Sequence, residues 1–333
     1  MFGKMKTAAP LISLLTLLFI IIGCKHEYPP FADYEVVGFA PVDSVMYGML
    51  FVNGECLFAL YDTTGAYNRW SMLQEYDLQD PTNLILQNTQ SLYLPPNSTF
   101  KDYQDSLVFF QASYYNYVIL NLIAYEFHTL HFEYNVLDIA HKEHFLFVST
   151  YEGLRVLDIS NLPDYVEVFN DSINRYGAFL ILRDTVLLDI HHFSGNYRAK
   201  IWNVKNPENP QTIYEVELPD VHSLTDIALT DQYIIMFDPY TICRYNHYMY
   251  DSLVYEDMLY LNQNYSSQRT SDLHIILAYG DHIELIGITD FSTQQISISG
   301  DWYYQILSLE IFEETIYLLV RKQGIYVLQR RES

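Results

Sequence analysis

The sequence contains few cysteines. Among its 333 residues only Cys24, Cys56 and Cys243 are cysteines, and the last two lie far apart in the chain. Folds that are held together by disulfides need several cysteine pairs, so this chain is not a disulfide scaffold. We expect Cys56 and Cys243 to be buried thiols that form no disulfide, because the repeats described below place them in units that are not adjacent. A chain of about 310 residues after residue 23 can rely on its hydrophobic core.

Basic residues are also scarce. The chain has 18 Lys and Arg against 41 Asp and Glu, which gives a net charge of −23. Removal of residues 1–23, which include Lys4 and Lys6 and no acid, makes the charge about −25. Such a surface repels phosphate backbones, so we expect no nucleic-acid partner. The Lys and Arg residues are scattered, which argues equally against polyanionic glycans, and the acidity mainly indicates solubility.

No hydrophobic run is long enough for a membrane-spanning helix. The apolar stretch from Leu11 to Ile22 has about 12 residues, whereas a helix that crosses a bilayer needs about 20. Lys4 and Lys6 precede this stretch, and Gly23-Cys24 follow it. A positive end, a short apolar segment and small residues at a cleavage site are the parts of a secretory signal peptide. Residues 1–23 are therefore predicted to be a signal peptide.

The end of this segment, Ile21-Ile22-Gly23-Cys24, resembles the lipobox of bacterial lipoproteins. The resemblance implies that Cys24 receives a lipid, and two or more acyl chains anchor a protein stably. We therefore expect a lipid-anchored envelope protein, bound to membrane lipid through Cys24, with residues 24–33 as a linker. Lys25 rather than Asp follows the cysteine, which favours the outer membrane over the inner one. The alternatives are an uncleaved transmembrane helix and a secretory signal without lipid.

Familiar catalytic motifs are absent. The sequence has no Gly-x-Ser-x-Gly elbow, no Walker loop and no Gly-x-Gly-x-x-Gly. Nucleophilic catalysis and nucleotide binding therefore have no support. A pair of carboxylates for glycoside cleavage stays open among 41 acidic residues, because such a pair needs only a separation in space.

After residue 33 the sequence has no segment in which apolar residues recur with the period of a helix. It has short runs that are apolar, or that alternate between apolar and polar residues, and turn residues separate these runs. Val45 to Val52, for example, leads through Asn53-Gly54, a hairpin signal, into Cys56 to Tyr61. This pattern is typical of an all-β fold. The 31 Tyr fit half-buried strand positions. The alternative interpretation of these tyrosines is a binding face for sugar or protein.

Three segments share a pattern, in which an apolar strand is followed by Asp or Asn and a turn with Pro. They are Glu75 to Pro81, Gly153 to Pro163 and Ala199 to Pro210. The Asx side chain closes the turn, and Pro ends the strand. These segments resemble the LVIVD repeat of bacterial secreted and envelope proteins, which implies β-propeller blades. Equivalent positions occur at intervals of 37 to 45 residues, at Asp77, Asn121, Asp158, Asn203, Asn246, Thr289 and Leu328.

Such intervals are close to the ~40–45 residues of a four-stranded propeller blade. We therefore predict an all-β fold, a seven-bladed β-propeller of four-stranded antiparallel blades, in a single domain over residues 34–331. Tyr34 to Phe39 is a strand without a partner, and the last repeat lacks a fourth strand, so the N-terminal strand is predicted to close the ring. The alternatives are six blades with an insertion over residues 262–300, and two β-sandwiches.

Propeller ligands usually bind at the face that carries the blade-to-blade loops and the loops between second and third strands. The residues that we assign to this candidate ligand face are Arg175, Tyr176, His191, His192, Asp220 and His222. Three histidines with one carboxylate are a candidate transition-metal site. Adjacent His191 and His192 point to opposite sides of a strand, however, and solvated loop histidines are the preferred interpretation.

Asp138-Ile139-Ala140 and Asp226-Ile227-Ala228 occupy matching positions in the inner strands of blades 3 and 5. The two carboxylates are candidates to line the central channel and attract Ca²⁺ or another cation. The preferred alternative is that each carboxylate binds backbone N–H groups where an inner strand begins.

These features favour a monomeric, non-enzymatic binding or scaffold module at the envelope, whose propeller engages a protein or a glycan without a cofactor. The alternative function is an envelope hydrolase or lyase acting on carbohydrate, with a metal at His191, His192 and His222.

Overall fold

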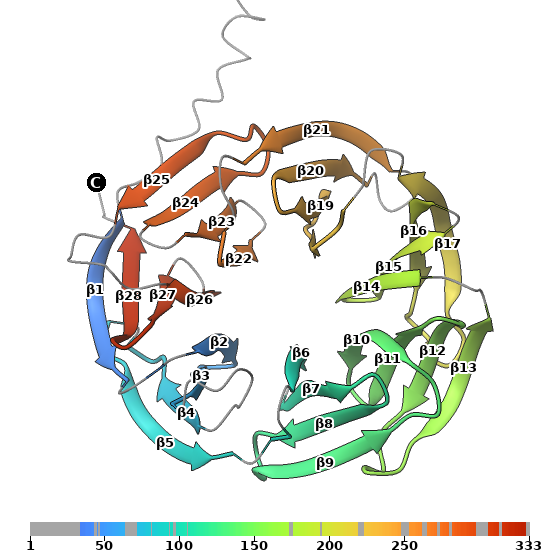
Figure 1. Cartoon of the computed structure of the whole chain (residues 1–333), viewed down its shortest axis with the longest axis horizontal. Coiled ribbons are helices and arrows are strands. Elements are labelled where there is room, and N and C mark those ends of the chain that lie inside the picture. The colour runs from blue at the N-terminus through green and yellow to red at the C-terminus, as the bar shows by residue number, and fades with distance from the viewer. Residues whose placement is uncertain are drawn as a thin grey trace, which may run out of the picture.

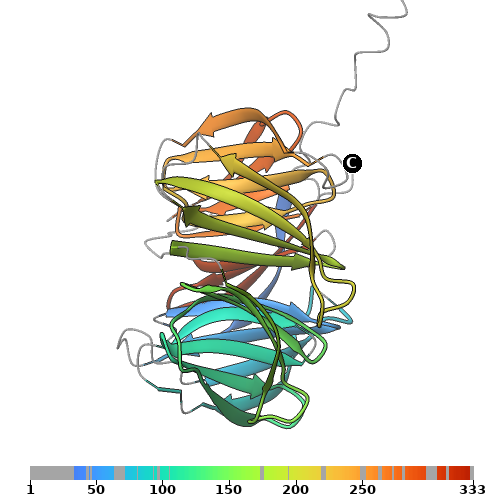
Figure 2. The ribbon, with the colours of Figure 1, turned by 90° about the vertical axis from the view of Figure 1, so that its right-hand side faces the viewer.

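The computed structural model describes residues 34–42, 45, 47–63, 72–80, 82–92, 94–95, 98–104, 106–172, 176–193, 195–218, 223–247, 253–261, 265–271, 274–279, 282–297, 306–312 and 315–330. The elements in these ranges are all β-strands, β1 to β28. They form seven four-stranded antiparallel sheets. The sheets are arranged as blades around a central channel (Figure 1). Seen from the side, the ring is a thick disc (Figure 2).

The strands of each blade follow one another from the channel outwards. Blade 1 contains β2 (Tyr47–Asn53), β3 (Cys56–Asp62), β4 (Met72–Asp77) and β5 (Ile85–Ser91). Blade 2 contains β6 (Thr99–Gln104), β7 (Leu107–Ser113), β8 (Asn116–Asn121) and β9 (Glu126–His131). Blade 3 contains β10 (Val136–Lys142), β11 (Phe145–Thr150), β12 (Gly153–Asp158) and β13 (Val166–Ser172). Blade 4 contains β14 (Tyr176–Arg183), β15 (Val186–Phe193), β16 (Asn196–Asn203) and β17 (Gln211–Leu218).

The other three blades follow the same plan. Blade 5 contains β18 (Asp226–Leu229), β19 (Tyr233–Asp238), β20 (Thr241–Asn246) and β21 (Val254–Tyr260). Blade 6 contains β22 (Ser267–Thr270), β23 (His274–Ala278), β24 (His282–Gly287) and β25 (Thr293–Ser297). Blade 7 contains β26 (Ile306–Phe312), β27 (Thr315–Val320), β28 (Gly324–Arg330) and β1 (Tyr34–Pro41). The seven-bladed prediction is confirmed, and the six-bladed and β-sandwich alternatives are wrong, because residues 262–300 contain the strands of blade 6.

The N-terminal strand closes the ring, as predicted. β1 pairs antiparallel with β28, with Val36 opposite Leu328 and Phe39 opposite Tyr326. The two rings of the second pair lie 4.7 Å apart between centroids. Blade 7 therefore combines the two ends of the described chain, and the edge of β28 is covered.

The turn that follows the third strand has the predicted chemistry in the first four blades. The N–H of Gln79 donates to Asp77 at 2.8 Å, and the N–H of Ser160 donates to Asp158 at 2.9 Å. Asn121 and Asn203 accept equivalent bonds. Each Asx side chain thus closes the turn that leads to the outer strand.

The core lies between neighbouring blades. One face of each sheet packs on the next, so the buried apolar side chains form seven clusters, one at each blade interface. Leu57 and Tyr61 of blade 1, for example, share a cluster with Tyr317 and Val327 of blade 7. This alternation explains why the inner strands and middle strands are apolar on both sides.

The two cysteines of the propeller lie in blades 1 and 5, as predicted, and form no disulfide. Cys243 is buried, whereas Cys56 is half-buried, so the expectation of two buried thiols is wrong for Cys56. Its position at the start of β3, beside a turn, explains the exposure. The predicted signal peptide, Cys24 and the linker to residue 33 lie outside the described residues. Within the described ranges, no helix is long and apolar enough to cross a membrane.

Candidate functional site: the inter-blade face and the central channel

The propeller has two different faces. One face carries the blade-to-blade connections and the loops between second and third strands, and we call it the inter-blade face. The opposite face is called the far face. These two kinds of loop contact each other: the N–H of Val136 donates to the carbonyl of Tyr114 at 2.9 Å, and the N–H of Leu261 donates to that of Tyr240 at 2.7 Å. The predicted ligand face is the inter-blade face.

Of the six residues assigned to that face, three lie outside the described residues: Arg175, Asp220 and His222. The backbone of Tyr176 begins β14 and pairs with His192 of β15. The structure thus brings Tyr176 and His192 together at the inter-blade end of blade 4.

His191 does not belong to the ligand face. It lies within β15, alternates with Leu187 and Asp189 on the side of the strand that packs on blade 3, and is only 2% exposed. Its Nδ1 lies 3.5 Å from Oδ1 of Asp189, which is also buried. The placement of His191 in a loop was wrong because β15 continues as far as Phe193.

His192 points to the other side of β15, where its ring lies 5.3 Å from that of Tyr197. The two neighbouring histidines therefore cannot bind one metal ion. Among the residues described, no group of three or more His, Cys, Asp or Glu side chains is close enough to hold a metal. A metal site at His191, His192 and His222 is thus not supported by the two members whose positions are known.

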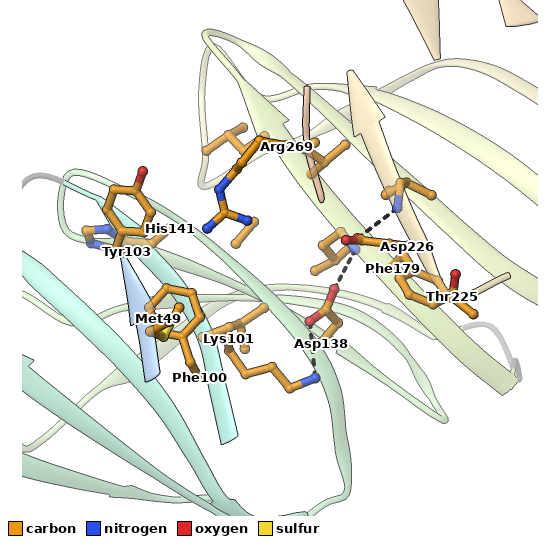
Figure 3. Close-up of a pocket in the computed structure, with 16 residues that line it drawn as sticks. Met49, Phe100, Lys101, Tyr103, Asp138, His141, Phe179, Thr225, Asp226 and Arg269 are labelled. Atoms are coloured by element: carbon orange, nitrogen blue, oxygen red, sulfur yellow. Dashed lines mark hydrogen bonds and ion pairs between the residues drawn. The ribbon is translucent and has the colours of Figure 1, made fainter. Parts of the chain in front are cut away.

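The central channel contains a cavity of about 620 Å³, a volume typical of small-molecule sites. Its wall is made by the inner strands of blades 1 to 6, including both predicted residues, Asp138 of β10 and Asp226 of β18 (Figure 3). This wall also contains two cations that were not predicted from the sequence, Lys101 of β6 and Arg269 of β22. Neither residue has a motif around it, and only the closed ring brings them opposite the acids.

Asp138 connects three blades. Its Oδ1 lies 3.5 Å from Lys101 Nζ of blade 2, and its Oδ2 accepts a hydrogen bond of 2.9 Å from the N–H of Leu180 in blade 4. Burial raises the pKa of Asp138 to about 6, although Lys101 and two backbone N–H groups counteract this shift. Asp226 adds to the rise through repulsion.

Asp226 and Arg269 continue the contacts around the channel. Asp226 accepts hydrogen bonds from its neighbour Ile227 at 2.8 Å and from Gln268 of blade 6 at 2.7 Å. Arg269 Nε lies 3.2 Å from Glu310 of blade 7, and its Nη2 donates to the carbonyl of Leu50 in blade 1 at 3.4 Å. Each predicted aspartate therefore lines the channel and also accepts a hydrogen bond from a backbone N–H group. Binding of Ca²⁺ or another cation by these carboxylates stays a prediction.

The inter-blade face carries exposed tyrosines in blades 2, 3 and 5. Five of them lie in its loops or at the adjoining strand end, with exposed fractions from 39% to 75%: Tyr114, Tyr115, Tyr151, Tyr240 and Tyr260. We call this set the tyrosine surface. The signal for it in the sequence is a tyrosine in the turn between second and third strands, which occurs at Tyr114, Tyr115, Tyr151 and Tyr240.

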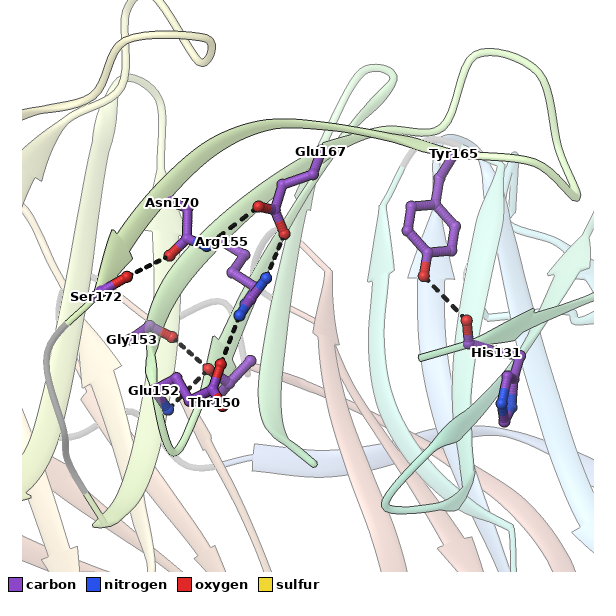
Figure 4. Close-up of polar contacts among 9 residues, drawn as sticks. All are labelled: His131, Thr150, Glu152, Gly153, Arg155, Tyr165, Glu167, Asn170 and Ser172. Atoms are coloured by element: carbon purple, nitrogen blue, oxygen red, sulfur yellow. Dashed lines mark hydrogen bonds and ion pairs between the residues drawn. The ribbon is translucent and has the colours of Figure 1, made fainter. Parts of the chain in front are cut away.

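The turn that carries Tyr151 is held in place by hydrogen bonds (Figure 4). Thr150 Oγ1 donates to the carbonyl of Gly153 at 2.9 Å and accepts from the N–H of Glu152 at 3.1 Å. Arg155 lies 2.6 Å from Glu152 and 4.1 Å above the ring of Tyr134. This turn of the inter-blade face is therefore held in one conformation by its own side chains.

The chain is similar in structure to solved proteins of very different sequence. The β-propeller domain of Myceliophteria thermophila Cps50 (Swd1) superposes with a TM-score of 0.61 at 11% identity, over 88% of this chain and 99% of that domain. The computationally designed protein Ika8 gives a TM-score of 0.55 at 10% identity, over 88% and 98% of the two chains. At such identities the likeness shows the β-propeller fold alone. The sequence matches no family model and no curated protein, so the resemblance to the LVIVD repeat stays a prediction.

Proposed function

We propose that this protein is an envelope lipoprotein, anchored through Cys24, whose propeller is a non-enzymatic binding module for a protein or a glycan. The observation that carries the proposal is the tyrosine surface. Tyrosine offers a large, rigid contact area with a polar tip, and it is enriched where proteins bind partners. The tyrosine surface lies on the face where propellers commonly bind. Its turn at Tyr151 is fixed by a hydrogen bond from the Thr150 hydroxyl, and its turn at Tyr240 by one from the N–H of Leu261.

The direction of β1 supports presentation of this surface away from a membrane. β28 starts at Gly324, next to a loop of the inter-blade face, and Tyr34 pairs with Arg330 at its other end. The described chain therefore begins at the far face. The ten residues from Cys24 to Asp33 span at most about 35 Å. A lipid on Cys24 would thus hold the far face towards the membrane.

The strand β21 offers a matched pair of variants to test the tyrosine surface. Tyr260 ends this strand at the inter-blade face beside Tyr240, whereas Tyr255 is exposed near its far-face end. The full chain in detergent is immobilised, and binding of envelope proteins and of a panel of neutral glycans is measured. We expect the double variant Tyr240→Ser with Tyr260→Ser to lose at least tenfold in affinity for whatever the wild type binds, and Tyr255→Ser to retain it.

Equal binding by the double variant and the wild type would contradict the proposal. Turnover of a glycan by the purified chain, with no stable binding, would instead favour the alternative of an envelope hydrolase or lyase. Anchoring is tested separately: Cys24→Ser should move the protein from the membrane fraction to the soluble fraction.

A further inference from the structure

Exposed aliphatic side chains lie at one end of the propeller only. Within the described part of the chain, every exposed Val, Ile or Leu lies in the first three residues of an outer strand or in the turn before one. These residues are Val36, Ile85, Leu86, Ile123, Val166, Ile213 and Val254. Outer strands begin at the far face, because the loops between third and fourth strands lie there. The far face therefore exposes aliphatic groups, whereas the inter-blade face exposes tyrosines.

Five exposed apolar side chains lie in the blade where the described chain begins and in the next two blades. These are blades 7, 1 and 2, whose outer strands β1, β5 and β9 follow one another along the rim of the ring (Figure 1). The exposed fractions of the five side chains run from 38% to 81%. We call this set the apolar rim, and its members are Val36, Ile85, Leu86, Ile123 and Phe127.

Contacts between these blades hold the apolar rim in a fixed shape. β1 passes so close to blade 1 that a Cβ atom at Gly38 would overlap the carbonyl of Thr82, in the loop that leads to Ile85. Tyr125, in the same turn as Ile123, donates a hydrogen bond of 2.5 Å to Glu75 of blade 1. The apolar rim is thus part of three packed blades and not a set of separate loops.

The charges beside the apolar rim indicate which lipid it fits. Glu35 and Glu126 are exposed and adjoin Val36 and Phe127 in the sequence. The chain as a whole has a net charge of −23. Anionic headgroups would be repelled by these acids, whereas headgroups without net charge would not. Aliphatic side chains have no polar tip, so they are stabilised where they reach the boundary between headgroups and acyl chains.

We propose that the apolar rim rests on the surface of a bilayer whose headgroups carry no net charge, with the tyrosine surface on the side away from it. The inference rests on the proposed anchor at Cys24 and goes beyond the binding module. The tether enters the propeller at this rim, and the ten residues from Cys24 to Asp33 span at most about 35 Å. Five partly exposed side chains bind a bilayer weakly by themselves. A tether makes this contact intramolecular and raises its effective concentration.

The test tethers the propeller to vesicles without relying on lipidation. The chain from residue 24, with Cys24→Ser and an N-terminal histidine tag, is bound to phosphatidylcholine vesicles that contain nickel-chelating lipid. All strands of the ring lie after residue 33, so this chain retains the whole propeller. Ile123→Trp adds a fluorophore to the apolar rim, and Tyr240→Trp adds one to the tyrosine surface as the matched control, since both residues are exposed and lie in turns.

Brominated phosphatidylcholine quenches tryptophans that reach the acyl chains. We expect the emission added by Ile123→Trp to fall by about half on brominated vesicles, and the emission added by Tyr240→Trp to stay unchanged. Further substitution of the Ile123→Trp protein with Ile85→Ser and Leu86→Ser should reduce this quenching, because it removes apolar groups from the rim. Replacing part of the phosphatidylcholine by phosphatidylglycerol should also reduce it, because the acids beside the rim repel the anionic lipid.

Several results would overturn the proposal. They are equal quenching at positions 123 and 240, no quenching at position 123 in the tethered protein, and quenching that is unaffected by Ile85→Ser with Leu86→Ser. A dimer of the untethered chain that Ile123→Ser abolishes would assign the apolar rim to a second copy instead of lipid. Circular dichroism and the melting temperature of each variant show whether a loss of quenching reflects unfolding.

Failure of the apolar rim and failure of the anchor are distinguishable. A native chain that stays in the soluble fraction would contradict the anchor at Cys24, while quenching at position 123 of the tagged chain would still support the rim. A native chain in the membrane fraction, with no quenching of the tagged chain, would leave the anchor and refute the rim.

Discussion

Two glycines let β1 enter the ring. A Cβ atom at Gly38 would overlap the backbone carbonyl of Thr82 in the neighbouring blade, and one at Gly324 would overlap the backbone of Ala40. Gly324 also has φ of +143°, a conformation that other residues rarely adopt. Close approach of two backbones, rather than flexibility, therefore explains both glycines.

Gly38→Ala should destabilise the protein by about 1–3 kcal/mol, because the Thr82 carbonyl has to move away from the added methyl group. Urea unfolding measures this change. Gly54→Asn is the control, since that glycine has φ of +60° and open space around it, and Asn tolerates this conformation. If Gly38→Ala lowers the stability no more than Gly54→Asn does, the close packing of β1 on blade 1 is contradicted.

The buried carboxyl group of Asp138 should make stability depend on pH. Its pKa is raised from 3.8 to about 6 in the folded protein, so the folded state holds the proton more tightly than the unfolded chain does. The stability due to this group is thus fully present below the unfolded pKa and is lost as the pH rises through about 6. Relative to Asp138→Asn, which cannot titrate, the wild type should gain about 1–3 kcal/mol between pH 7.5 and pH 4.5. Urea unfolding of both proteins at both pH values measures this gain. A difference in stability between the wild type and Asp138→Asn that does not change with pH would contradict the prediction.

At the scale of the strand, individual hydrogen bonds join the blades to one another, in addition to the apolar packing between their sheets. The hydroxyl of Ser308 in β26 accepts a hydrogen bond of 3.0 Å from the buried N–H of Leu50 in β2. Arg269 of β22 binds the carbonyl of the same Leu50. These contacts join blades 6, 7 and 1 on the channel side of the seam that β1 closes at the outer edge.

Ser308→Ala should cost about 1–3 kcal/mol, because it leaves the buried N–H of Leu50 without an acceptor. Ser172→Ala is the matched control, since this serine is exposed in the outer strand β13 and should change stability by less than about 0.5 kcal/mol. Thermal or urea unfolding compares the two. Equal effects of the two variants would show that the Ser308 contact does not stabilise the seam.

The strands were predictable where the sequence repeats a local chemistry. Asp77 and Asp158 close their own turns through bonds to residues two positions ahead, so short-range pattern was enough to count the blades. His191 was misplaced, because nothing local shows that β15 continues beyond Ile190. The contact of Arg269 with Leu50 joins residues 219 positions apart, and only the closed ring creates it.

At the scale of the whole molecule, three places have different properties. The far face is where the described chain begins, the inter-blade face carries the tyrosine surface, and Asp138 and Asp226 line the channel. The net charge of −23 belongs to the chain as a whole and should repel polyanions from all three. Composition predicts this repulsion, but it contains no information on which side chains the folded ring places in the channel and which on the inter-blade face.

All of these assignments require that the first strand closes the ring, and disulfide trapping tests this pairing directly. Phe39 and Tyr326 face each other in the pairing of β1 with β28, so Phe39→Cys with Tyr326→Cys should form a disulfide on mild oxidation, detected by mass spectrometry of the digested protein. Phe39→Cys with Tyr260→Cys places the second thiol in blade 5 and should not cross-link. A cross-link in this control, or none between positions 39 and 326 in the folded protein, would contradict closure of the propeller by its N-terminal strand.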